Sequence, residues 1–296
     1  VIRPVPATAP FSGKPIELDV AIVGAGPAGA AAALALGGRG LRVGIIEKAV
    51  PPRYKTCGGG VLRRAFALLP LDLRAAVERE CFAAEIVHHG PDLRFVCRRD
   101  RPVISMVMRD RFDHLITGAA QQGGAQLFAG TAVLDVSPAG EDVRLATSAG
   151  EMRARFVIAA DGASSVVARK TGRPELRGIV PALECEVTLA PEAMEPLMHT
   201  ARLDFGFVPS GYAWVFPKRD HLSIGVGTTR RGAAHLPEYY RRYLELLGIG
   251  RPLREQRHGF VIPCRPREGL FGARRVLFAG DAAGFADPVT AEGITG

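Results

Sequence analysis

The residues from Gly24 to Gly29 have the types and the spacing of a phosphate-binding turn, Gly-Ala-Gly-Pro-Ala-Gly. In such a turn the first glycine permits a tight bend, the second lets the backbone approach a pyrophosphate, and the third lets a helix pack closely on a strand. The free N–H groups at the start of the following helix favour an anion. The pattern therefore predicts a dinucleotide site whose residues are Gly24, Gly26, Pro27, Ala28 and Gly29.

The segments on either side of this turn predict the two strands that must hold it. The apolar run 19–23 is long enough for a buried parallel strand, and residues 41–47 give a second strand that ends in Glu47. Glu47, followed by Lys48, is placed to accept hydrogen bonds from an adenosine ribose. The alternative is a membrane span over residues 20–38, which carry no charge, but five glycines and one proline argue against a helix in lipid.

Two further segments combine glycine and aspartate after a short apolar run. Asp161 and Gly162 follow Val-Ile-Ala-Ala, and Gly280 and Asp281 follow Val-Leu-Phe-Ala. The glycine turn alone could equally hold NAD, so these two segments decide the cofactor. Three such segments in this order along one chain predict a single site for FAD.

The composition is that of a globular enzyme with an excess of arginine. The chain has 296 residues, 47% of them hydrophobic, and a formal net charge of +8 that comes almost entirely from arginine, because only five lysines are present. Excess arginine suits a phosphate-bearing ligand or an anionic membrane surface, and codon bias explains it equally well. No run combines basic and aromatic residues, so we expect no nucleic-acid partner.

The cysteines and histidines predict neither disulfides nor a metal. The five cysteines are scattered and odd in number, which is typical of reduced thiols in a cytoplasmic protein. No CxxC motif exists, and the seven histidines lack the spacing of metal ligands. Contact with a membrane surface remains an alternative within this cytoplasmic localisation.

The order of the segments predicts an α/β fold, α+β overall: a Rossmann-like FAD-binding domain with a parallel sheet, interleaved with a mostly antiparallel β domain for the substrate. The FAD-binding domain is predicted to comprise residues 19–80, 103–175 and 270–296. The substrate-binding domain is predicted to comprise residues 81–102 and 176–269. The first eighteen residues contain four prolines and no apolar core of a signal peptide, so a disordered extension is expected over 1–18.

Four further elements can be placed from their patterns. Residues 108–122 and 237–247 predict helices, each followed by glycine. A hairpin turn is expected at 137–140, and residues 275–279 are expected to return to the first sheet as a strand. Tyrosines and leucines lie partly on one side of the second helix, which could rest on a membrane surface; packing on the sheet is the interpretation we favour.

The three nucleotide-binding segments resemble those of the para-hydroxybenzoate-hydroxylase-type flavoproteins. The resemblance implies that Asp161-Gly162 closes over the pyrophosphate and that Asp281 meets the ribityl chain of the flavin. It implies that the segment from Pro288 to Gly293 leads to a helix whose N-terminus faces the flavin ring. It also implies that Arg109 flanks FAD, although an ion pair with a neighbouring aspartate at the surface is the alternative.

Two more motifs resemble the geranylgeranyl reductases within that superfamily. The run Pro-Ser-Gly-Tyr-Ala-Trp-Val-Phe-Pro, which ends at Pro217, is followed by Gly225-Val226-Gly227, and this fits the pattern PxxYxWxFP…GxG. The run Lys-Thr-Cys-Gly-Gly-Gly resembles that family's cysteine-glycine segment beside the flavin, here Cys57, Gly58 and Gly59. The resemblance implies that reduced FAD saturates double bonds of a polyprenyl chain. Relatives continue beyond Asp281 into helices that complete the substrate cavity, and we expect this part to be absent here.

Tyr212, Trp214 and Phe216 alternate, so on a strand all three face the same side. They could form an aromatic wall that holds a prenyl chain against the flavin, or they could be an ordinary core stripe of a sheet. Gly225 lacks a side chain on a probable neighbouring strand and could leave room for the ligand.

An isolated prenyl double bond is electron-rich, so a proton must reach one carbon while a hydride reaches the other. Cys57 is our candidate proton donor, because a thiol is mostly protonated at neutral pH. The alternatives are that Cys57 is a small buried hydrophobe and that water or the flavin supplies the proton.

The sequence contains no second dinucleotide-binding turn, so the electrons are expected from NAD(P)H that docks transiently or from a protein such as ferredoxin. Two other functions remain open. One is that of an aromatic hydroxylase (a flavin monooxygenase) or a halogenase of the same superfamily, although a halogenase would carry a second tryptophan in its WxWxIP motif. The other is a non-catalytic electron carrier or a degenerate flavin-binding module.

Overall fold

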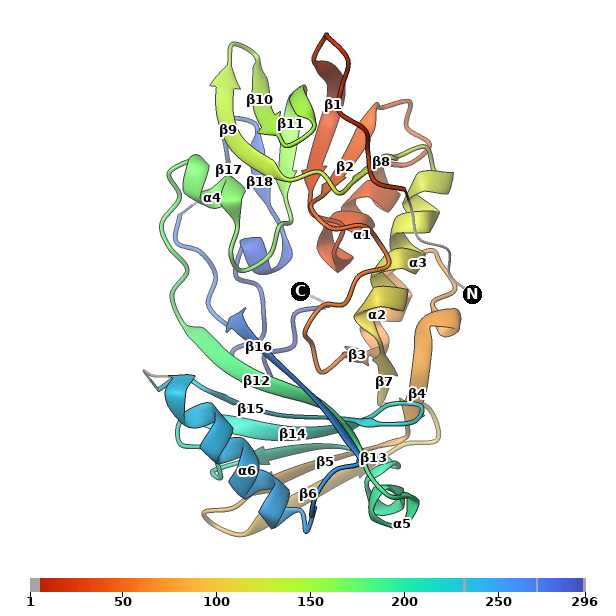
Figure 1. Cartoon of the computed structure of the whole chain (residues 1–296), viewed down its shortest axis with the longest axis vertical. Helices are drawn as coiled ribbons and strands as arrows, with labels where there is room; N and C mark the ends of the chain where they lie inside the picture. The colour runs from red at the N-terminus through yellow and green to blue at the C-terminus, as the bar shows by residue number, and fades with distance from the viewer. Residues whose placement is uncertain (1–5, 231–232, 270, 295–296) are drawn as a thin grey trace.

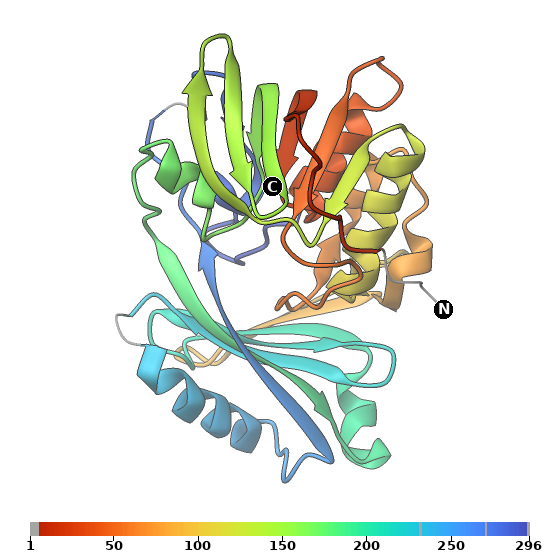
Figure 2. The ribbon, with the colours of Figure 1, turned by 45° about the horizontal axis from the view of Figure 1, so that its top comes forward.

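The computed structural model describes residues 6–230, 233–269 and 271–294, and its elements form two large sheets one above the other (Figure 1). The upper sheet carries α1 and α3, and the lower sheet carries α6 on its outer side (Figure 2). A small third sheet connects them. This arrangement confirms the predicted fold class, a mixed α/β protein with one largely parallel sheet and one largely antiparallel sheet.

The first sheet has the strand order β17-β18-β11-β1-β2-β8. Neighbours from β18 to β8 run parallel, and a hairpin formed by β9 and β10 continues from β11 in antiparallel fashion. The strands are β1 (Ile16–Val23), β2 (Val43–Glu47), β8 (Gln126–Ala129), β9 (Val133–Ala139), β10 (Asp142–Thr147), β11 (Gly150–Ala159), β17 (Gly272–Ala273) and β18 (Val276–Phe278).

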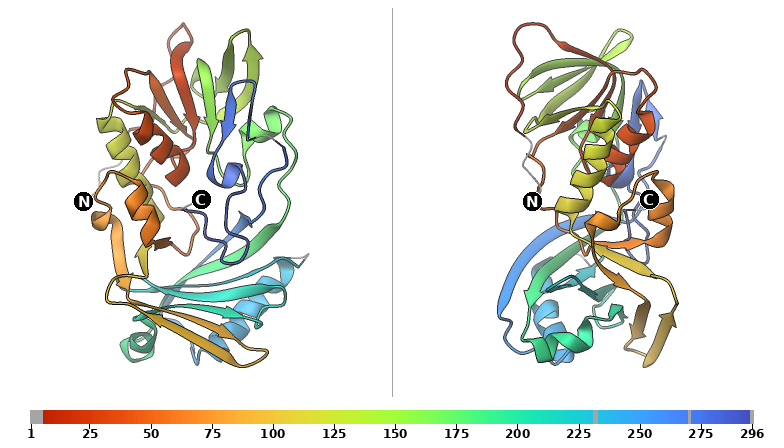
Figure 3. Two further views of the ribbon diagram at one scale, coloured as in Figure 1. Left: turned by 180° about the vertical axis from the view of Figure 1, so that it is seen from behind. Right: turned by 90° about the vertical axis from the view of Figure 1, so that its right-hand side faces the viewer.

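Both faces of the first sheet are covered, which explains why its central strands read as continuous apolar runs. Helices α1 (Pro27–Leu36) and α3 (Arg109–Gln122) lie side by side on one face, as the views from behind and from the side show (Figure 3). The β9–β10 hairpin, α4 (Val166–Lys170) and Phe11 pack on the other face. The predicted helix over 108–122 and the returning strand at 275–279 are confirmed. The hairpin exists, but its turn lies at residues 140–141, because residues 137–139 still belong to β9.

The second sheet has the order β16-β12-β15-β14-β13-β5-β6 and is antiparallel except between β13 and β5. Helix α6 (Leu236–Leu246) covers its outer face, where Tyr240 and Tyr243 are buried. This packing confirms the interpretation that we favoured for the helix at 237–247. The strands are β5 (Ala83–His88), β6 (Leu93–Arg98), β12 (Ile179–Thr188), β13 (Thr200–Phe205), β14 (Gly211–Pro217), β15 (Leu222–Thr228) and β16 (Arg254–Pro263).

The third sheet is a short antiparallel one in which β7 (Ile104–Val107) lies between β3 (Gly60–Leu62) and β4 (Val77–Cys81). The short helix α2 (Arg63–Leu68) follows β3, and α5 (Pro191–Met194) precedes β13. Among the described residues, no helix is long and apolar enough to cross a membrane.

The predicted disordered extension over residues 1–18 is wrong for its described part. Strand β1 begins at Ile16, and before it the backbone N–H groups of Thr8 and Phe11 donate to the carbonyls of Ala129 and Ala149, at 2.8 and 2.7 Å. The prolines prevent a helix here, but the segment takes hydrogen-bond partners from the edge of the first sheet. Residues 1–5 lie outside the described residues.

We propose to keep the predicted division into two domains, because it separates the two large sheets. The strands of the first sheet lie within residues 19–80, 103–175 and 270–296, apart from the start of β1. The strands of the second sheet lie within 81–102 and 176–269.

Candidate functional site

The glycine turn after β1 is shaped by contacts that only glycine permits. Gly24 has a φ of +104°, and a Cβ there would lie 2.3 Å from the carbonyl oxygen of Ala160. A Cβ on Gly29 would lie 2.0 Å from the carbonyl oxygen of Gly24, so α1 packs directly on the turn. Gly26, by contrast, faces open space, since the nearest atom to its Cβ position is Arg109 Nη2 at 3.7 Å.

The start of α1 has the features of an anion site. The helix begins at Pro27, and Gly26 before it has an extended backbone and no side chain to cap the free N–H groups. Those N–H groups and the helix dipole are therefore available to a phosphate. Pro27 and Ala28 lie in the first turn of the helix, as the sequence predicted. The open side of Gly26 and the uncapped helix end fit the pyrophosphate of FAD.

The three segments that the sequence singled out converge on this turn. The Cβ position of Gly24 lies 3.1 Å from Asp161 Cα, and that of Gly280, which has a φ of +54°, lies 2.8 Å from Ala28 Cβ. The turns after β1, β11 and β18 therefore meet at the same edge of the parallel sheet. This is the edge at which ligands bind in open α/β sheets.

Glu47 is buried at the end of β2 and is held beside the turn. Its Oε2 accepts a hydrogen bond from Ala25 N at 2.9 Å, and its Oε1 accepts one from Ala49 N at 3.0 Å. Arg53 lies 3.4 Å from Oε2 as an ion-pair partner. These contacts fix the carboxylate at the position where the sequence predicted a ribose, while Lys48 is exposed. The ribose role itself stays a prediction.

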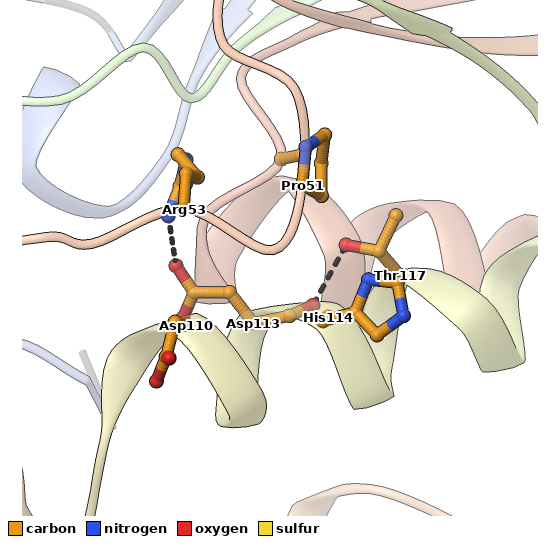
Figure 4. A pocket seen from close by; sticks show the side chains of 7 residues that line it. Pro51, Arg53, Asp110, Asp113, His114 and Thr117 are labelled. Carbon is orange, nitrogen blue, oxygen red and sulfur yellow. Dashed lines mark hydrogen bonds and ion pairs between the residues drawn. The ribbon is translucent and has the colours of Figure 1, made fainter. Parts of the chain in front are cut away.

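Arg109 forms an ion pair with a neighbouring aspartate, which was the alternative to contact with FAD, and its role beside FAD stays a prediction. Its Nε and Nη2 donate to the two oxygens of Asp113 at 2.7 and 2.9 Å. Arg53 donates to the same carboxylate at 2.9 Å, as Figure 4 shows. Burial lowers the pKa of Arg109, but the ion pair with Asp113 outweighs it and raises the pKa above its ordinary value. The pair is buried rather than at the surface, and the guanidinium also faces the open side of Gly26.

Asp161 caps a helix in addition to meeting the turn. Its Oδ2 accepts hydrogen bonds from Val166 N and Val167 N at the start of α4, at 2.7 and 3.2 Å. Its Oδ1 is buried and has no hydrogen-bond partner among the described residues. Gly162 has a φ of +80° and open space at its Cβ position. This unpaired oxygen beside an open glycine fits a polar ligand group, and its contact with the pyrophosphate stays a prediction.

Asp281 follows β18 and lies near two cations. Burial raises the pKa of its carboxyl, and Lys55 and Arg109 oppose that shift. A Cβ on Gly293 would lie 3.1 Å from Asp281 Oδ1, so the loop through the exposed Pro288 returns to this acid. The described residues after Gly280 form no α-helix, and the flavin-facing helix that the resemblance implies lies outside the described residues.

The loop that carries Cys57 is fixed by a buried lysine that sequence reasoning missed. Lys218 is fully buried, and its Nζ donates to the carbonyl oxygens of Gly58 at 2.5 Å and Val107 at 3.0 Å. Gly59 N donates to Cys57 Sγ at 3.3 Å, and the thiol also contacts the guanidinium of Arg109. A usable signal was present, because Lys218 directly follows Pro217 and is one of only five lysines.

Gly59 has a φ of +69°, and a Cβ there would lie 2.1 Å from the carbonyl oxygen of Val107. The loop therefore needs glycine in order to reach β7. Lys55, three residues earlier, places its Nζ 3.0 Å from the centre of the Phe260 ring. Burial, and then the positive charge of Arg109, lower the pKa of the Lys55 ammonium to about 8.

Tyr212, Trp214 and Phe216 form a continuous row on the inner face of the second sheet, which we call the aromatic wall. Neighbouring ring centres are 5.7 and 6.5 Å apart. A Cβ on Gly58 would lie 2.9 Å from Phe216 Cδ2 and 3.2 Å from Trp214 Nε1, so the Cys57 loop rests on this wall. Pro217, which is buried, ends the strand that carries the wall.

The expectation that Gly225 leaves room for a ligand is wrong, because Trp214 occupies the space. A Cβ on Gly225 would lie 2.0 Å from Trp214 Cζ2. Gly225 therefore lets the indole lie flat on β15. Tyr212 also has a partner within the protein, since its hydroxyl donates to the carbonyl oxygen of Thr290 at 3.0 Å. Both rings are buried, so the wall is at the same time a core stripe.

Comparisons with known proteins agree with this geometry. The family model for the FAD binding domain matches residues 17–207. Digeranylgeranylglycerophospholipid reductase 1 of Methanopyrus kandleri is 32% identical, over 94% of this chain and 77% of that protein. Geranylgeranyl diphosphate reductase of Rhodobacter capsulatus is 29% identical, over 94% and 72%. A solved structure, a geranylgeranyl bacteriochlorophyll reductase-like protein of Thermoplasma acidophilum, shares the fold with a TM-score of 0.81 at 24% identity, over 95% of this chain and 75% of that one.

The matched domain, the fold and the convergent turns define an FAD-dependent oxidoreductase. Within that class, the chain belongs to the geranylgeranyl reductase family. These matches confirm the resemblance to the geranylgeranyl reductases and the prediction that the cofactor is FAD. The predicted absence of a metal and of a nucleic-acid partner stays a prediction.

Proposed function

We propose that this protein reduces carbon–carbon double bonds in a polyprenyl chain of the geranylgeranyl type. The observation that carries the proposal is the contact between the aromatic wall and the Cys57 loop, which brings an apolar surface to the edge of the flavin site. The names of the two relatives, both reductases of geranylgeranyl compounds, support this substrate class.

The residues of the first sheet would hold the cofactor. The start of α1 with Gly26 would bind the pyrophosphate, Glu47 the ribose, and Asp281 the ribityl chain. We keep four further residues that the sequence predicts to contact FAD, namely Lys48, Gly162, Pro288 and Gly293. When bound and reduced, FAD supplies a hydride.

The residues of the second sheet would hold the prenyl chain and exclude water from it. Leu203, Phe205 and Ile262 pack beside the aromatic wall and extend its apolar surface. An apolar chain on such a surface is removed from water, which favours binding and keeps water from the reacting carbon. Because Tyr212 and Trp214 are already buried, the substrate would lie along the exposed edge of this surface.

Cys57 would donate the proton that complements the hydride. Its thiol contacts Arg109, whose guanidinium also lies 3.7 Å from the Cβ position of Gly26. We expect Cys57→Ser to retain FAD and to lose most turnover, because a serine hydroxyl is a much weaker acid. Cys264→Ser, which changes another half-buried thiol, is the control. Unchanged turnover in Cys57→Ser would remove this residue from the mechanism.

Electrons would reach the flavin from NAD(P)H or from a small protein such as ferredoxin. Peripheral contact with a membrane would bring the protein to its lipid-like substrate. Reduction by NADPH and by reduced ferredoxin, followed at the flavin absorbance, distinguishes the two donors.

The test is anaerobic photoreduction of the FAD-loaded protein, followed by mixing with geranylgeranyl diphosphate and mass spectrometry of the product. A product heavier by pairs of hydrogen atoms supports the proposal. Oxygen incorporation in air would instead show a monooxygenase, and chloride incorporation a halogenase. Reoxidation by an electron acceptor without any change in the prenyl compound would show an electron carrier.

A further inference from the structure

Two glutamates lie side by side next to the aromatic wall, at a buried position where two negative charges are energetically unfavourable. Glu184 and Glu186 are alternate residues of β12 and are 1% and 8% exposed. They stand opposite Gly225 and Ser223 of β15, on the same face of the second sheet as Trp214. Two carboxylates so close in a buried place cannot both ionise without a large penalty.

A chain of polar contacts joins these glutamates to the surface. Exposed Asp220 contacts His221 Nδ1 at 2.7 Å, and His221 Nε2 forms an ion pair with Glu186 Oε2 at 2.8 Å. The Tyr54 hydroxyl lies 3.4 Å from Glu186 Oε1 and 3.0 Å from Glu184 Oε2. The groups therefore extend from solvent through one histidine to two carboxyls, with His221 and Glu186 in contact as an ion pair and not as an aligned hydrogen bond. Tyr54, which is 42% exposed, opens the network to solvent at a second point.

The same network reaches the Cys57 loop by packing and not by a further hydrogen bond. Ser223 Oγ donates to Glu184 Oε1 at 2.8 Å, and Trp214 Nε1 donates to Ser223 Oγ at 3.3 Å. Trp214 Nε1 in turn lies against Gly58, the residue after Cys57. Tyr54 is attached to the same loop, three residues before Cys57.

The hydrogen-bond pattern of this network accommodates an extra proton. The tyrosine has one hydroxyl proton, yet its oxygen lies within hydrogen-bond distance of both carboxyls. Ser223 gives its proton to Glu184, because it accepts one from the indole of Trp214. If both glutamates were ionised, one contact with Tyr54 would have no hydrogen. A proton held by one carboxyl supplies it.

Glu184 is the carboxyl better suited to hold this proton. Glu186 forms an ion pair with His221, whereas Glu184 is the more deeply buried and, within the part of the chain that the structure describes, has Tyr54 and Ser223 as its hydrogen-bond partners. Burial first, and then the charge of Glu186, raise the pKa of Glu184 to about 8. Lys218 opposes this shift, and His258 faces Glu184 from β16 with its ring 4.3 Å from that of Tyr54.

Tyr54 is neutral, and the surroundings of His221 favour its protonated form. Burial and the two carboxylates raise the pKa of Tyr54, so its hydroxyl is not ionised at neutral pH. Burial lowers the pKa of His221, but its contacts with Glu186 and Asp220 outweigh this effect and raise it. A neutral tyrosine between two carboxyls can accept a proton from one side while it donates on the other.

We propose that Glu184 stores a proton for the reduction of the double bond and passes it through Tyr54 to the donor beside the flavin, while Glu186 and His221 replace it from solvent. This rests on the proposed function. In each turnover the π bond of the substrate breaks and two C–H bonds form, one from the hydride of reduced flavin and one from the donor's proton. Flavin is oxidised, and Glu184 is left as a carboxylate until it is reprotonated. Glu184 is thus a positioning residue that acts through Tyr54.

The stored proton is tested without substrate. Infrared spectra of the FAD-loaded protein should show the carbonyl stretch of a protonated carboxyl at neutral pH that disappears in alkaline buffer. This band should be lost in Glu184→Gln and kept in Tyr54→Phe. Glu255→Gln is the matched control, since Glu255 belongs to the same sheet but lies opposite Val187, in the core under α6.

The delivery of the proton is tested by single-turnover oxidation of the photoreduced enzyme with geranylgeranyl diphosphate. Wild type should show a rate constant that falls above pH ~8, where Glu184 loses its proton. Glu184→Gln and Tyr54→Phe should photoreduce normally but oxidise about 100-fold more slowly, without that pH dependence. Glu255→Gln should follow wild type.

Each outcome decides the proposal. A band that persists in Glu184→Gln, or a variant that oxidises like wild type at every pH, overturns it while leaving the proposed function intact. A wild type that reduces no prenyl compound overturns the proposed function and with it the delivery step. Normal flavin content and normal photoreduction in the variants show that they fold, so a loss confined to the oxidation step supports the relay.

Discussion

The two sheets build their halves of the site by different means. On the first sheet the site is made of backbone, because glycines at the turns after β1 and β18 allow segments from three parts of the chain to meet. On the second sheet it is made of buried side chains, because Lys218, Glu184 and Glu186 place ionisable groups in the interior. The first arrangement leaves no room for a side chain at Gly24 and Gly29, whereas the second depends on protonation and charge.

This difference explains why changes in the two halves should have different signatures. Substitution in a glycine turn acts through steric exclusion and should be independent of pH. Substitution in the buried polar network acts through protonation and desolvation and should vary with pH. Four substitutions test this difference between the two halves.

Gly29→Ala should abolish FAD binding and strongly destabilise the first sheet, because the added Cβ would lie 2.0 Å from the carbonyl oxygen of Gly24. Flavin absorbance after desalting and thermal unfolding measure both effects. Gly118→Ala in α3 is the matched control, since no atom lies within 4 Å of its Cβ position. It should be neutral or stabilise by about 1 kcal/mol. Comparable behaviour of the two variants would contradict the packing argument.

Glu184→Gln should remove a slope in the pH dependence of stability. The pKa of Glu184 is raised from 4.5 to about 8 on folding, so between these values the folded protein binds more protons than the unfolded chain. The free energy of unfolding of wild type therefore falls as pH rises through this window, by at most on the order of 5 kcal/mol. Urea unfolding at a series of pH values should show this fall in wild type and not in the variant. Parallel curves would argue against a protonated Glu184.

Lys218→Met should lower the free energy of unfolding by about 2 kcal/mol, because it leaves the buried carbonyls of Gly58 and Val107 without a donor. FAD should be retained, and turnover should fall because the Cys57 loop loses its support. Lys170→Met, at an exposed lysine, should change stability by less than about 0.5 kcal/mol. Full turnover in Lys218→Met would show that the loop holds its position without the lysine.

Glu47→Ala should weaken FAD retention about tenfold, since the ribose would lose an acceptor while the glycine turn and the start of α1 remain. Equilibrium titration with FAD measures the change. Glu17→Ala, at an exposed acid of the same sheet, should bind FAD as wild type does. An unaltered affinity of Glu47→Ala would assign its carboxylate to Ala25, Ala49 and Arg53 alone.

The two halves of the site also differ in how far they could be predicted from the sequence. The glycine turn, the strand at 276–278 and the segments around Asp161 and Asp281 are local patterns, and each could be recognised where it stands. The environment of Lys218 depends on Gly58 and Val107, which are more than a hundred residues away in the sequence. Nothing local marks Glu184 as protonated, because its partners Tyr54 and Ser223 come from other segments.

Two errors have the same origin in long-range contacts. Gly225 was expected to leave a space, but the indole that fills it belongs to the neighbouring strand β14. The N-terminal segment was expected to be disordered from its prolines, but Ala129 and Ala149 supply the hydrogen bonds that its own sequence does not. In both cases the composition of the segment was interpreted correctly, but the sequence alone does not show which residues pack against it.

Lys218 joins the second sheet to the third, since it follows β14 and donates both to the loop before β3 and to β7. Movement of the second sheet away from this loop would take both acceptors from a fully buried ammonium group. Opening between the two sheets is therefore unfavourable at this point, and we expect the Cys57 thiol to act from a fixed position.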